Sequence, residues 1–465
     1  EVRDPSRMAE VLNRVIEKAF RGSAPAQINV PRDYWTQVID IELPPIVRFE
    51  RQGGGKEAIE NAAKLLSKAK FPVILSGAGV VLGGAIDECK KLAEKLDAPV
   101  CNGYQHNDSF PGSHPLAVGP LGYNGSKAAM ELISKADVVL ALGTRLNPFS
   151  TLPGYGIDYW PKKATIIQVD MNPDRIGLTK KVSVGICGDA KQVAQQILDK
   201  LSSDAGNTGR EERKNLIHKT KSAWLQTLSG LDHEEDDPGT VWNKEARERD
   251  KDRMSPRQAW RAIQDALPQD AIISSDIGNN CAIGNAYPTF EKPRKYLAPG
   301  LFGPCGYGFP AILGAKIGCP DTPVVGFAGD GAFGISMNEM SSCAREEWPA
   351  ITMVIFRNYQ WGAEKRNSIL WFDDNFVGTE LDPELSYAKV ANACGLKGVT
   401  CKTMEETTKA IKQSCEDQKK GITTFIEIIL NQELGEPFRR DAMKKPVKVA
   451  GIKKEDMKKQ PSLIS

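Results

Sequence analysis

Histidine is scarce in this 465-residue sequence, with four in all, so the side chain that most often moves protons near neutral pH is a poor candidate for the main chemistry. The 61 basic residues nearly balance the 59 acidic ones, which excludes the basic excess typical of nucleic-acid binding. No apolar run reaches the length of a membrane span, and no amino-terminal segment has the layout of a signal peptide. The ten cysteines form no C-x-x-C and no Cys/His cluster, which favours reduced thiols in a cytoplasmic protein.

The length of the chain predicts two or three domains, and its first segment is too small to be one of them. Residues 1–22 have apolar side chains at helical spacing, and a short strand is expected at Ala26–Val30. One helix and one strand cannot bury a core alone. Either they dock on a neighbour, or the rest of their domain is absent.

Residues 53–201 alternate between helical and strand patterns, which is typical of a parallel α/β sheet. We expect strands at Val73–Leu75, Ala136–Leu142 and Ala164–Val169, and a helix at Ala85–Leu96. Residues 202–253 are charged and predict a linker that carries a helix.

Residues 254–465 form a second α/β region with a polar, basic tail. Ser255 and Pro256 supply a helix N-cap followed by proline at the first helical position. Further elements are expected as a helix near Pro310–Ile317 and as strands at Ala271–Ser274, Val324–Ala328, Thr352–Phe356 and Thr423–Leu430. The predicted fold class is α/β, with mainly parallel sheets flanked by helices and a central Rossmann-like domain.

The strongest chemical signal is Gly329-Asp330-Gly331 at the end of an apolar strand. Ligands of open parallel sheets bind beyond the carboxyl ends of the strands, and glycines let the backbone approach them closely. Asn358 follows the next strand, 28 positions after Asp330, so both side chains are expected at neighbouring strand ends. Their oxygens suit Mg²⁺, which usually keeps substrate phosphates in its shell, so a diphosphate ligand is implied.

This spacing resembles the cofactor motif of thiamine-diphosphate enzymes in the acetolactate synthase-like superfamily. The resemblance implies that the side chains of Asp330 and Asn358 and the main-chain carbonyl of Gln360 bind the metal. Members usually have two adjacent asparagines, whereas Arg357 takes the first place here and leaves the ligand position intact. It also implies that residues 254–465 form the diphosphate-binding domain.

Two more segments resemble cofactor-binding parts of that superfamily. Residues 303–310 are similar to the segment that cradles the pyrimidine of the cofactor, and Cys305 stands where many members have a bulky apolar residue. Residues 276–280 resemble the loop that holds the diphosphate. The implied cofactor-binding residues are Asp276, Gly278, Asn279, Gly303, Cys305, Gly306, Gly329, Gly331, Ala332 and Gly362.

Longer strings, at residues 2–7, 31–35, 358–365 and 432–443, resemble the sulfoacetaldehyde acetyltransferase family more than acetolactate synthase. The implied reaction converts sulfoacetaldehyde and phosphate to acetyl phosphate and sulfite. Both substrates are anions, so basic residues near the metal motif or in these strings are the substrate candidates: Lys365, Arg366, Arg439 and Arg440. The alternative for each is a solvated surface charge.

The superfamily activates its cofactor with a glutamate from the first domain, and no residue of this sequence can be assigned that role. Residues 1–36 resemble only the last helix and strand of that pyrimidine-binding domain, which implies that residues 1–45 are its carboxyl-terminal remnant. We therefore expect the chain to be a fragment that is inactive alone. The superfamily's active sites form between subunits, which implies a homodimer or homotetramer.

Several other interpretations compete. Gly77-Ala78-Gly79 hints at a dinucleotide loop, but Leu82 takes the place of the last glycine, so packing glycines are favoured over an FAD site. His106 and His114 are expected to be hydrogen-bonded loop residues. Tyr359 and Trp361 line either the pocket or the core.

Two alternative functions also remain open at this stage. One is an acetolactate synthase-like carboligase that acts on 2-oxo acids, and the other is a non-catalytic binding or regulatory module.

Overall fold

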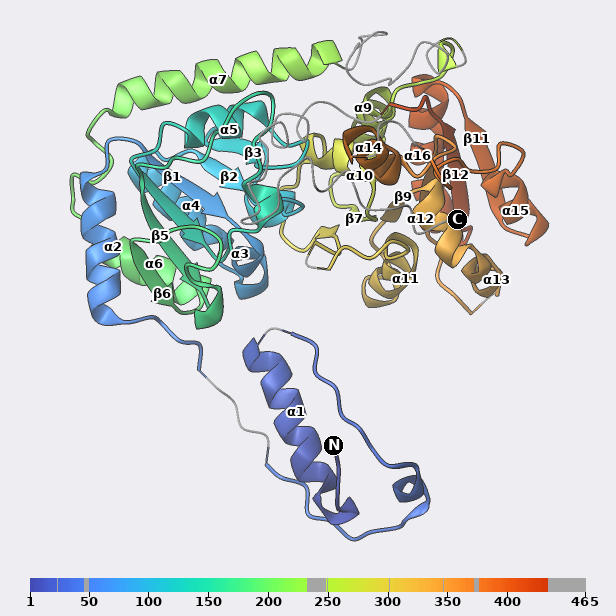
Figure 1. Cartoon of the computed structure of the whole chain (residues 1–465), viewed down its shortest axis with the longest axis horizontal. Helices are drawn as coiled ribbons and strands as arrows, with labels where there is room; N and C mark the ends of the chain where they lie inside the picture. Colours follow the sequence, from blue (N-terminus) through green and yellow to red (C-terminus); the bar gives the residue numbers. More distant parts are fainter. Residues whose placement is uncertain are drawn as a thin grey trace, which may run out of the picture.

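The computed structural model describes residues 1–22, 24–45, 50–231, 248, 250–300, 302–345, 347–371 and 376–433. Figure 1 shows two sheets side by side, each covered by helices, with the amino-terminal helix standing apart from both. Among the helices of these ranges, none is long and apolar enough to cross a membrane.

The amino-terminal segment contains η1 (Pro5–Arg7), α1 (Met8–Gly22) and η2 (Arg32–Thr36). The expected helix is confirmed, and it starts after a turn that the side chain of Asp4 caps. The strand expected at Ala26–Val30 is wrong, because this stretch pairs with no strand of the described chain. Its backbone contact with the start of the chain is a 2.8 Å hydrogen bond from the amide of Val2 to the carbonyl of Asn29.

The central sheet has six parallel strands in the order β3-β2-β1-β4-β5-β6, which is the doubly wound order of Rossmann-like domains. Its innermost strands are buried along their whole length because helices cover both faces. The strands are β1 (Pro72–Ser76), β2 (Val100–Asn102), β3 (Ala117–Pro120), β4 (Val138–Leu142), β5 (Thr165–Asp170) and β6 (Val184–Cys187). The helices are α2 (Lys56–Lys68), α3 (Ala78–Gly83), α4 (Ile86–Leu96), α5 (Lys127–Ile133) and α6 (Ala190–Lys200), with short turns η3 (Asn107–Ser109), η4 (Pro148–Ser150) and η5 (Pro173–Arg175).

The glycines after β1 allow two backbones to approach each other. The amide of Gly79 donates to the carbonyl of Gly143 at 2.8 Å, and a Cβ atom at Gly79 would lie 2.7 Å from the Cα atom of Gly143. A Cβ atom at Gly77 would lie 2.5 Å from that of Thr144. This close contact supports the interpretation of these glycines as packing residues.

Helix α7 (Arg210–Leu231) follows the central domain and runs along its side in Figure 1. Trp224 and Leu228 are buried, so the helix carries an apolar contact surface within the expected charged linker. The guanidinium of Arg213 is buried and donates to five backbone carbonyls, among them those of Leu96 and Lys70. These bonds tie the start of α7 to the central domain.

The second sheet has six parallel strands in the order β11-β12-β10-β9-β7-β8, which confirms the predicted fold class. Its strands are β7 (Ile272–Ser275), β8 (Tyr296–Leu297), β9 (Val324–Gly329), β10 (Thr352–Arg357), β11 (Lys397–Cys401) and β12 (Thr424–Ile429). The helices are α9 (Pro256–Ala266), α10 (Asn279–Ile283), α11 (Gly308–Gly318), α12 (Asp330–Ser336), α13 (Met340–Cys343), α14 (Gly362–Trp371), α15 (Tyr387–Ala393) and α16 (Met404–Gln418), with η6 (Gly284–Ala286) and η7 (Met337–Glu339). Ser255 and Gln258 form a complete capping box at α9, as the N-cap signal predicts.

Candidate cofactor site

Strands β9 and β10 are parallel neighbours, and Gly329 lies opposite Phe356 in their register. Asp330 and Asn358 follow these two positions, so they lie at the same edge of the sheet, as the spacing predicts. The connection between the strands contains α12, η7 and α13.

Asp330 is 1% exposed and begins helix α12. Its Oδ2 atom accepts a hydrogen bond from the amide of Tyr359 at 2.6 Å and lies 3.1 Å from Nη1 of Arg357. Its Oδ1 atom accepts from the amide of Gly331 at 2.9 Å. Burial raises the pKa of this carboxyl group to about 6, although Arg357 and the amides act in the opposite direction.

Tyr359 has a left-handed backbone, with φ of 62°, at the turn after β10. A non-glycine residue with this conformation is uncommon and marks a position that the surrounding structure must hold. The guanidinium carbon of Arg357 lies 4.2 Å from the centroid of the Tyr359 ring, which helps to fix the turn. This arrangement brings the Tyr359 amide to Asp330.

Two buried amide oxygens of the turn after β10 have no hydrogen-bond partner among the described residues: Oδ1 of Asn358 and Oε1 of Gln360. The nitrogens of the same two side chains do have partners, Oδ1 of Asn280 at 3.4 Å and the carbonyl of Gln432 at 3.3 Å. The described residues contain no cluster of three His, Cys, Asp or Glu side chains for a metal. A cation held by one carboxylate with amide and carbonyl oxygens, as expected for Mg²⁺, fits these residues.

Asp276 follows β7, and both of its carboxylate oxygens accept hydrogen bonds from backbone amides. Oδ1 accepts from Ile277 at 2.7 Å and from Gly306 at 3.1 Å, and Oδ2 accepts from Gly308 at 2.7 Å. Burial raises the pKa of Asp276, and the three amides act against this rise. Asp276 therefore holds the 303–310 segment against the sheet edge.

Glycines line the same edge for different reasons. Gly278, Gly303 and Gly306 have positive φ values, of 136°, 72° and 86°. Gly331 lies under the ring of Trp361, where a Cβ atom would be 2.8 Å from the ring. Gly329 has an ordinary φ of −68°, and a Cβ atom there would meet no described residue within 4 Å, so the described fold does not require glycine at this position.

Three further predicted cofactor positions surround this edge. Ala332 is buried in α12, and Cys305 is exposed. Gly362 begins α14, and a Cβ atom there would lie 3.1 Å from Nδ2 of Asn279, so these two residues are in contact.

The structure describes two of the four residues that the sequence suggests for substrate binding. Lys365 is fully buried and forms an ion pair with Glu380, and its Nζ lies 3.2 Å from Oε1 of Gln432. Arg366 donates to the hydroxyl of Tyr123, which comes from the central domain. Arg439 and Arg440 lie outside the described residues.

The two loop histidines differ in their surroundings, and the hydrogen bonds expected of such residues are found for the ring of His114. Burial and the neighbouring Arg145 lower the pKa of His106 to about 4, so its ring is neutral at pH 7. His114 accepts from the amide of Leu116 at 3.2 Å, and its other ring nitrogen lies 3.3 Å from Glu94.

Two contributors to the site were not predicted from the sequence. Glu427, on β12, is 2% exposed, and its Oε1 atom lies 3.8 Å from Nε of Arg357. Its signal in the sequence is a single acidic residue within the apolar run Thr423–Leu430. Tyr123, whose hydroxyl lies 3.0 Å from Oδ1 of Asn279, comes from a distant loop and has no comparable signal.

The comparisons with known proteins agree with this geometry. Residues 59–197 match the family described as "Thiamine pyrophosphate enzyme, central domain", and residues 276–428 match "Thiamine pyrophosphate enzyme, C-terminal TPP binding domain". A benzoylformate decarboxylase from Polynucleobacter necessarius has a similar structure, with a TM-score of 0.73 over 94% of this chain and 76% of its own. At 20% identity, this likeness shows the fold alone. The fold and the two matched domains define the class, a thiamine pyrophosphate enzyme.

The sequence relatives narrow this class. A probable sulfoacetaldehyde acetyltransferase of Rhizobium meliloti (strain 1021) is 78% identical over 99% of this chain and 78% of its own length. The sulfoacetaldehyde acetyltransferase of Roseovarius nubinhibens is 75% identical over 99% of this chain and 76% of its own. A probable acetolactate synthase large subunit of Methanocaldococcus jannaschii is only 28% identical, over 89% of this chain and 68% of its own. The chain belongs to the sulfoacetaldehyde acetyltransferase family.

Proposed function

We propose that this chain serves a thiamine-diphosphate- and Mg²⁺-dependent conversion of sulfoacetaldehyde and phosphate to acetyl phosphate and sulfite. The observation that carries the proposal is the pairing of Asp330 with the unpartnered Oδ1 of Asn358 at neighbouring strand ends. The identity of 78% with a probable sulfoacetaldehyde acetyltransferase supports the choice of substrate. We also propose a cytoplasmic homo-oligomer, either a dimer or a tetramer.

The residues of the site have distinct tasks in this proposal. Asp330, Asn358 and the main-chain carbonyl of Gln360 would hold Mg²⁺ against the diphosphate. Asp276 keeps the Gly306 amide and its neighbours in place at the pyrimidine side. When bound, thiamine diphosphate supplies the nucleophilic carbon and the electron sink for breaking a bond next to a carbonyl carbon.

Recognition of the two anionic substrates requires positive charge. Both described candidates, Lys365 and Arg366, keep this role in the proposal, and Glu380 forms an ion pair with Lys365. Arg366 is 9% exposed and contacts Tyr123, so it lies where the two large domains meet. Arg439 and Arg440 stay candidates from the sequence.

The test measures sulfite and acetyl phosphate together, with and without phosphate, in the presence of thiamine diphosphate and Mg²⁺. The assay uses the 465-residue chain and any longer product that its gene encodes, which also tests the expectation that this chain is inactive alone. Release of both products in equal amounts, only with phosphate, is the result expected of the active protein. Conversion of pyruvate to acetolactate without sulfite release would instead support the carboligase, and binding without any turnover would support the non-catalytic module.

A further inference from the structure

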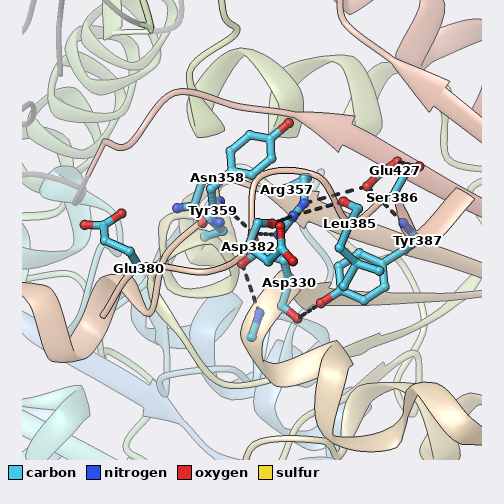
Figure 2. A network of polar contacts seen from close by, with 12 residues as sticks. Asp330, Arg357, Asn358, Tyr359, Glu380, Asp382, Leu385, Ser386, Tyr387 and Glu427 are labelled. Atoms are coloured by element: carbon cyan, nitrogen blue, oxygen red, sulfur yellow. Dashed lines mark hydrogen bonds and ion pairs between the residues drawn. The ribbon is translucent and has the colours of Figure 1, made fainter. Parts of the chain in front are cut away.

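Three charged side chains are buried together behind the predicted metal site. Asp330, Arg357 and Glu427 are each at most 2% exposed. Nη1 of Arg357 lies 3.1 Å from Oδ2 of Asp330, and its Nε lies 3.8 Å from Oε1 of Glu427. Figure 2 shows the guanidinium joined to both carboxylates. With all three ionised, the group carries one net negative charge.

A guanidinium beside Asp330 has an electrostatic consequence for a cation at that carboxylate. On its own, the positive charge would offset the negative charge that attracts a divalent ion. Glu427 supplies a second negative charge from β12, where it lies opposite Ile355 of the neighbouring strand β10. The Arg357–Glu427 pair is neutral as a unit, so the charge of Asp330 stays available.

The surroundings of Glu427 hold a carboxylate in one position. Its Oε2 atom accepts from the hydroxyl of Ser386 at 2.7 Å and from that of Thr400 at 3.3 Å, and Oε1 accepts from the amide of Tyr387 at 3.1 Å. The hydroxyl of Tyr387 donates to the carbonyl of Asp330 at 2.9 Å, so the same segment returns to the metal motif.

Arg357 is fixed by the same loop. Its Nη2 atom donates to the carbonyl of Leu385 at 3.0 Å and also to that of Asp382. The guanidinium therefore cannot turn away from Asp330 without losing buried hydrogen bonds. Its charge must be balanced where it lies.

We propose that Glu427 is a charge-balancing and positioning residue, which holds Arg357 so that Asp330 keeps its net charge for a divalent cation. The proposal rests on the cofactor site proposed above and adds a residue that acts on the metal through Arg357. It predicts that the affinity for Mg²⁺ falls when the three residues lose their net negative charge and returns when that charge is restored.

The test is a calorimetric titration of the 465-residue chain with Mg²⁺ at a fixed thiamine diphosphate concentration. Glu427→Gln keeps the shape of the side chain, and the hydroxyls of Ser386 and Thr400 can rotate to accept from its new NH₂ group. This variant makes the group neutral. The Mg²⁺ concentration at half-saturation is expected to rise roughly tenfold or more.

The double variant Arg357→Gln/Glu427→Gln separates charge from structure. It restores one net negative charge, so its half-saturating Mg²⁺ concentration should return to within about threefold of the wild type. A merely structural role predicts that the double variant binds as weakly as Glu427→Gln or more weakly. Arg213→Gln, which also breaks a buried network but lies at the start of α7 against the central domain, should lower the melting temperature and leave Mg²⁺ binding unchanged.

Unchanged Mg²⁺ binding in Glu427→Gln would overturn the proposal, as would a folded double variant that stays as weak as the single one. If the double variant does not fold, the comparison of Glu427→Gln with Arg213→Gln decides. Absence of Mg²⁺-dependent binding in the wild-type chain would contradict the cofactor site itself. A failed sulfite assay with intact Mg²⁺ binding would contradict only the proposed reaction.

Discussion

The side chain of Asn358 donates from Nδ2 to Oδ1 of Asn280 over 3.4 Å, while its own Oδ1 atom is buried with no hydrogen-bond partner among the described residues. A buried acceptor left unsatisfied costs about 1–3 kcal/mol, so the fold gains nothing from this oxygen. An oxygen that does not serve the fold, placed beside a buried carboxylate, is what a metal site requires. Asn358 should therefore matter for binding more than for stability.

We expect Asn358→Ala to raise the half-saturating Mg²⁺ concentration by roughly tenfold or more, with little change in melting temperature. The reason is the loss of one oxygen ligand that makes no contribution to the fold. Calorimetric titration with Mg²⁺ and thiamine diphosphate, together with thermal unfolding, measures both effects.

Gln360→Ala is the matched control for Asn358→Ala, because the ligand predicted at this position is the main-chain carbonyl, which alanine keeps. Its Mg²⁺ affinity should stay within about threefold of the wild type. Equal losses in both variants would show that side-chain packing, rather than ligation, governs binding at this turn.

Gly329 offers a second test of the site, because no atom of the described chain lies within 4 Å of a Cβ atom there. Gly329→Ala should leave the melting temperature unchanged or slightly higher, since its φ of −68° suits alanine. The added methyl group should weaken thiamine diphosphate binding by roughly tenfold, because it fills space left for the ligand. Gly314→Ala, at an equally open position on α11, is the control and should bind normally. Full binding by Gly329→Ala would place the cofactor elsewhere.

The metal motif was predictable because it depends on short-range features. A glycine-flanked aspartate after an apolar strand, and an asparagine after the next one, suffice to place Asp330 and Asn358 at one edge of a parallel sheet. Arg357 and Glu427 are 70 positions apart in the sequence. Their contact depends on the register of β10 against β12. No local pattern specifies such a long-range pairing.

The expected strand at Ala26–Val30 fails for a related reason. A β-strand needs a neighbouring strand for its backbone hydrogen bonds, and local preference does not supply one. In the structure, the contact of this segment with the start of the chain is a single bond from Val2 to Asn29. Strands that lie between covered faces, such as Val324–Gly329, are instead marked by continuous apolar runs.

The neutral ring of His106 predicts a pH dependence of stability. Its pKa is lowered to about 4 in the folded chain by burial and by Arg145, from 6.5 in the unfolded chain. Between these values the unfolded chain binds the extra proton, so stability is present above pH 6.5 and is lost as the pH falls. The free energy of unfolding should drop by about 1–3 kcal/mol from this residue between pH 6.5 and 4.

Urea unfolding at a series of pH values measures this effect. His106→Gln cannot take up a proton, so its stability should fall less steeply over the same range. Parallel curves for His106→Gln and the wild type would contradict the assignment.

The buried hydrogen bonds of Arg213 are expected to contribute much of the attachment of α7 to the central domain. Its guanidinium is 1% exposed and donates to the carbonyls of Lys70, Leu96, Asp97, Gly206 and Thr208. Arg213→Ala leaves these acceptors without their donor, and we expect it to lower the free energy of unfolding by about 3 kcal/mol or more. Lys214→Ala, one position further on and exposed, should change it by less than about 0.5 kcal/mol. Similar values for the two variants in urea unfolding would show that the carbonyls find other partners and that α7 is held mainly by Trp224 and Leu228.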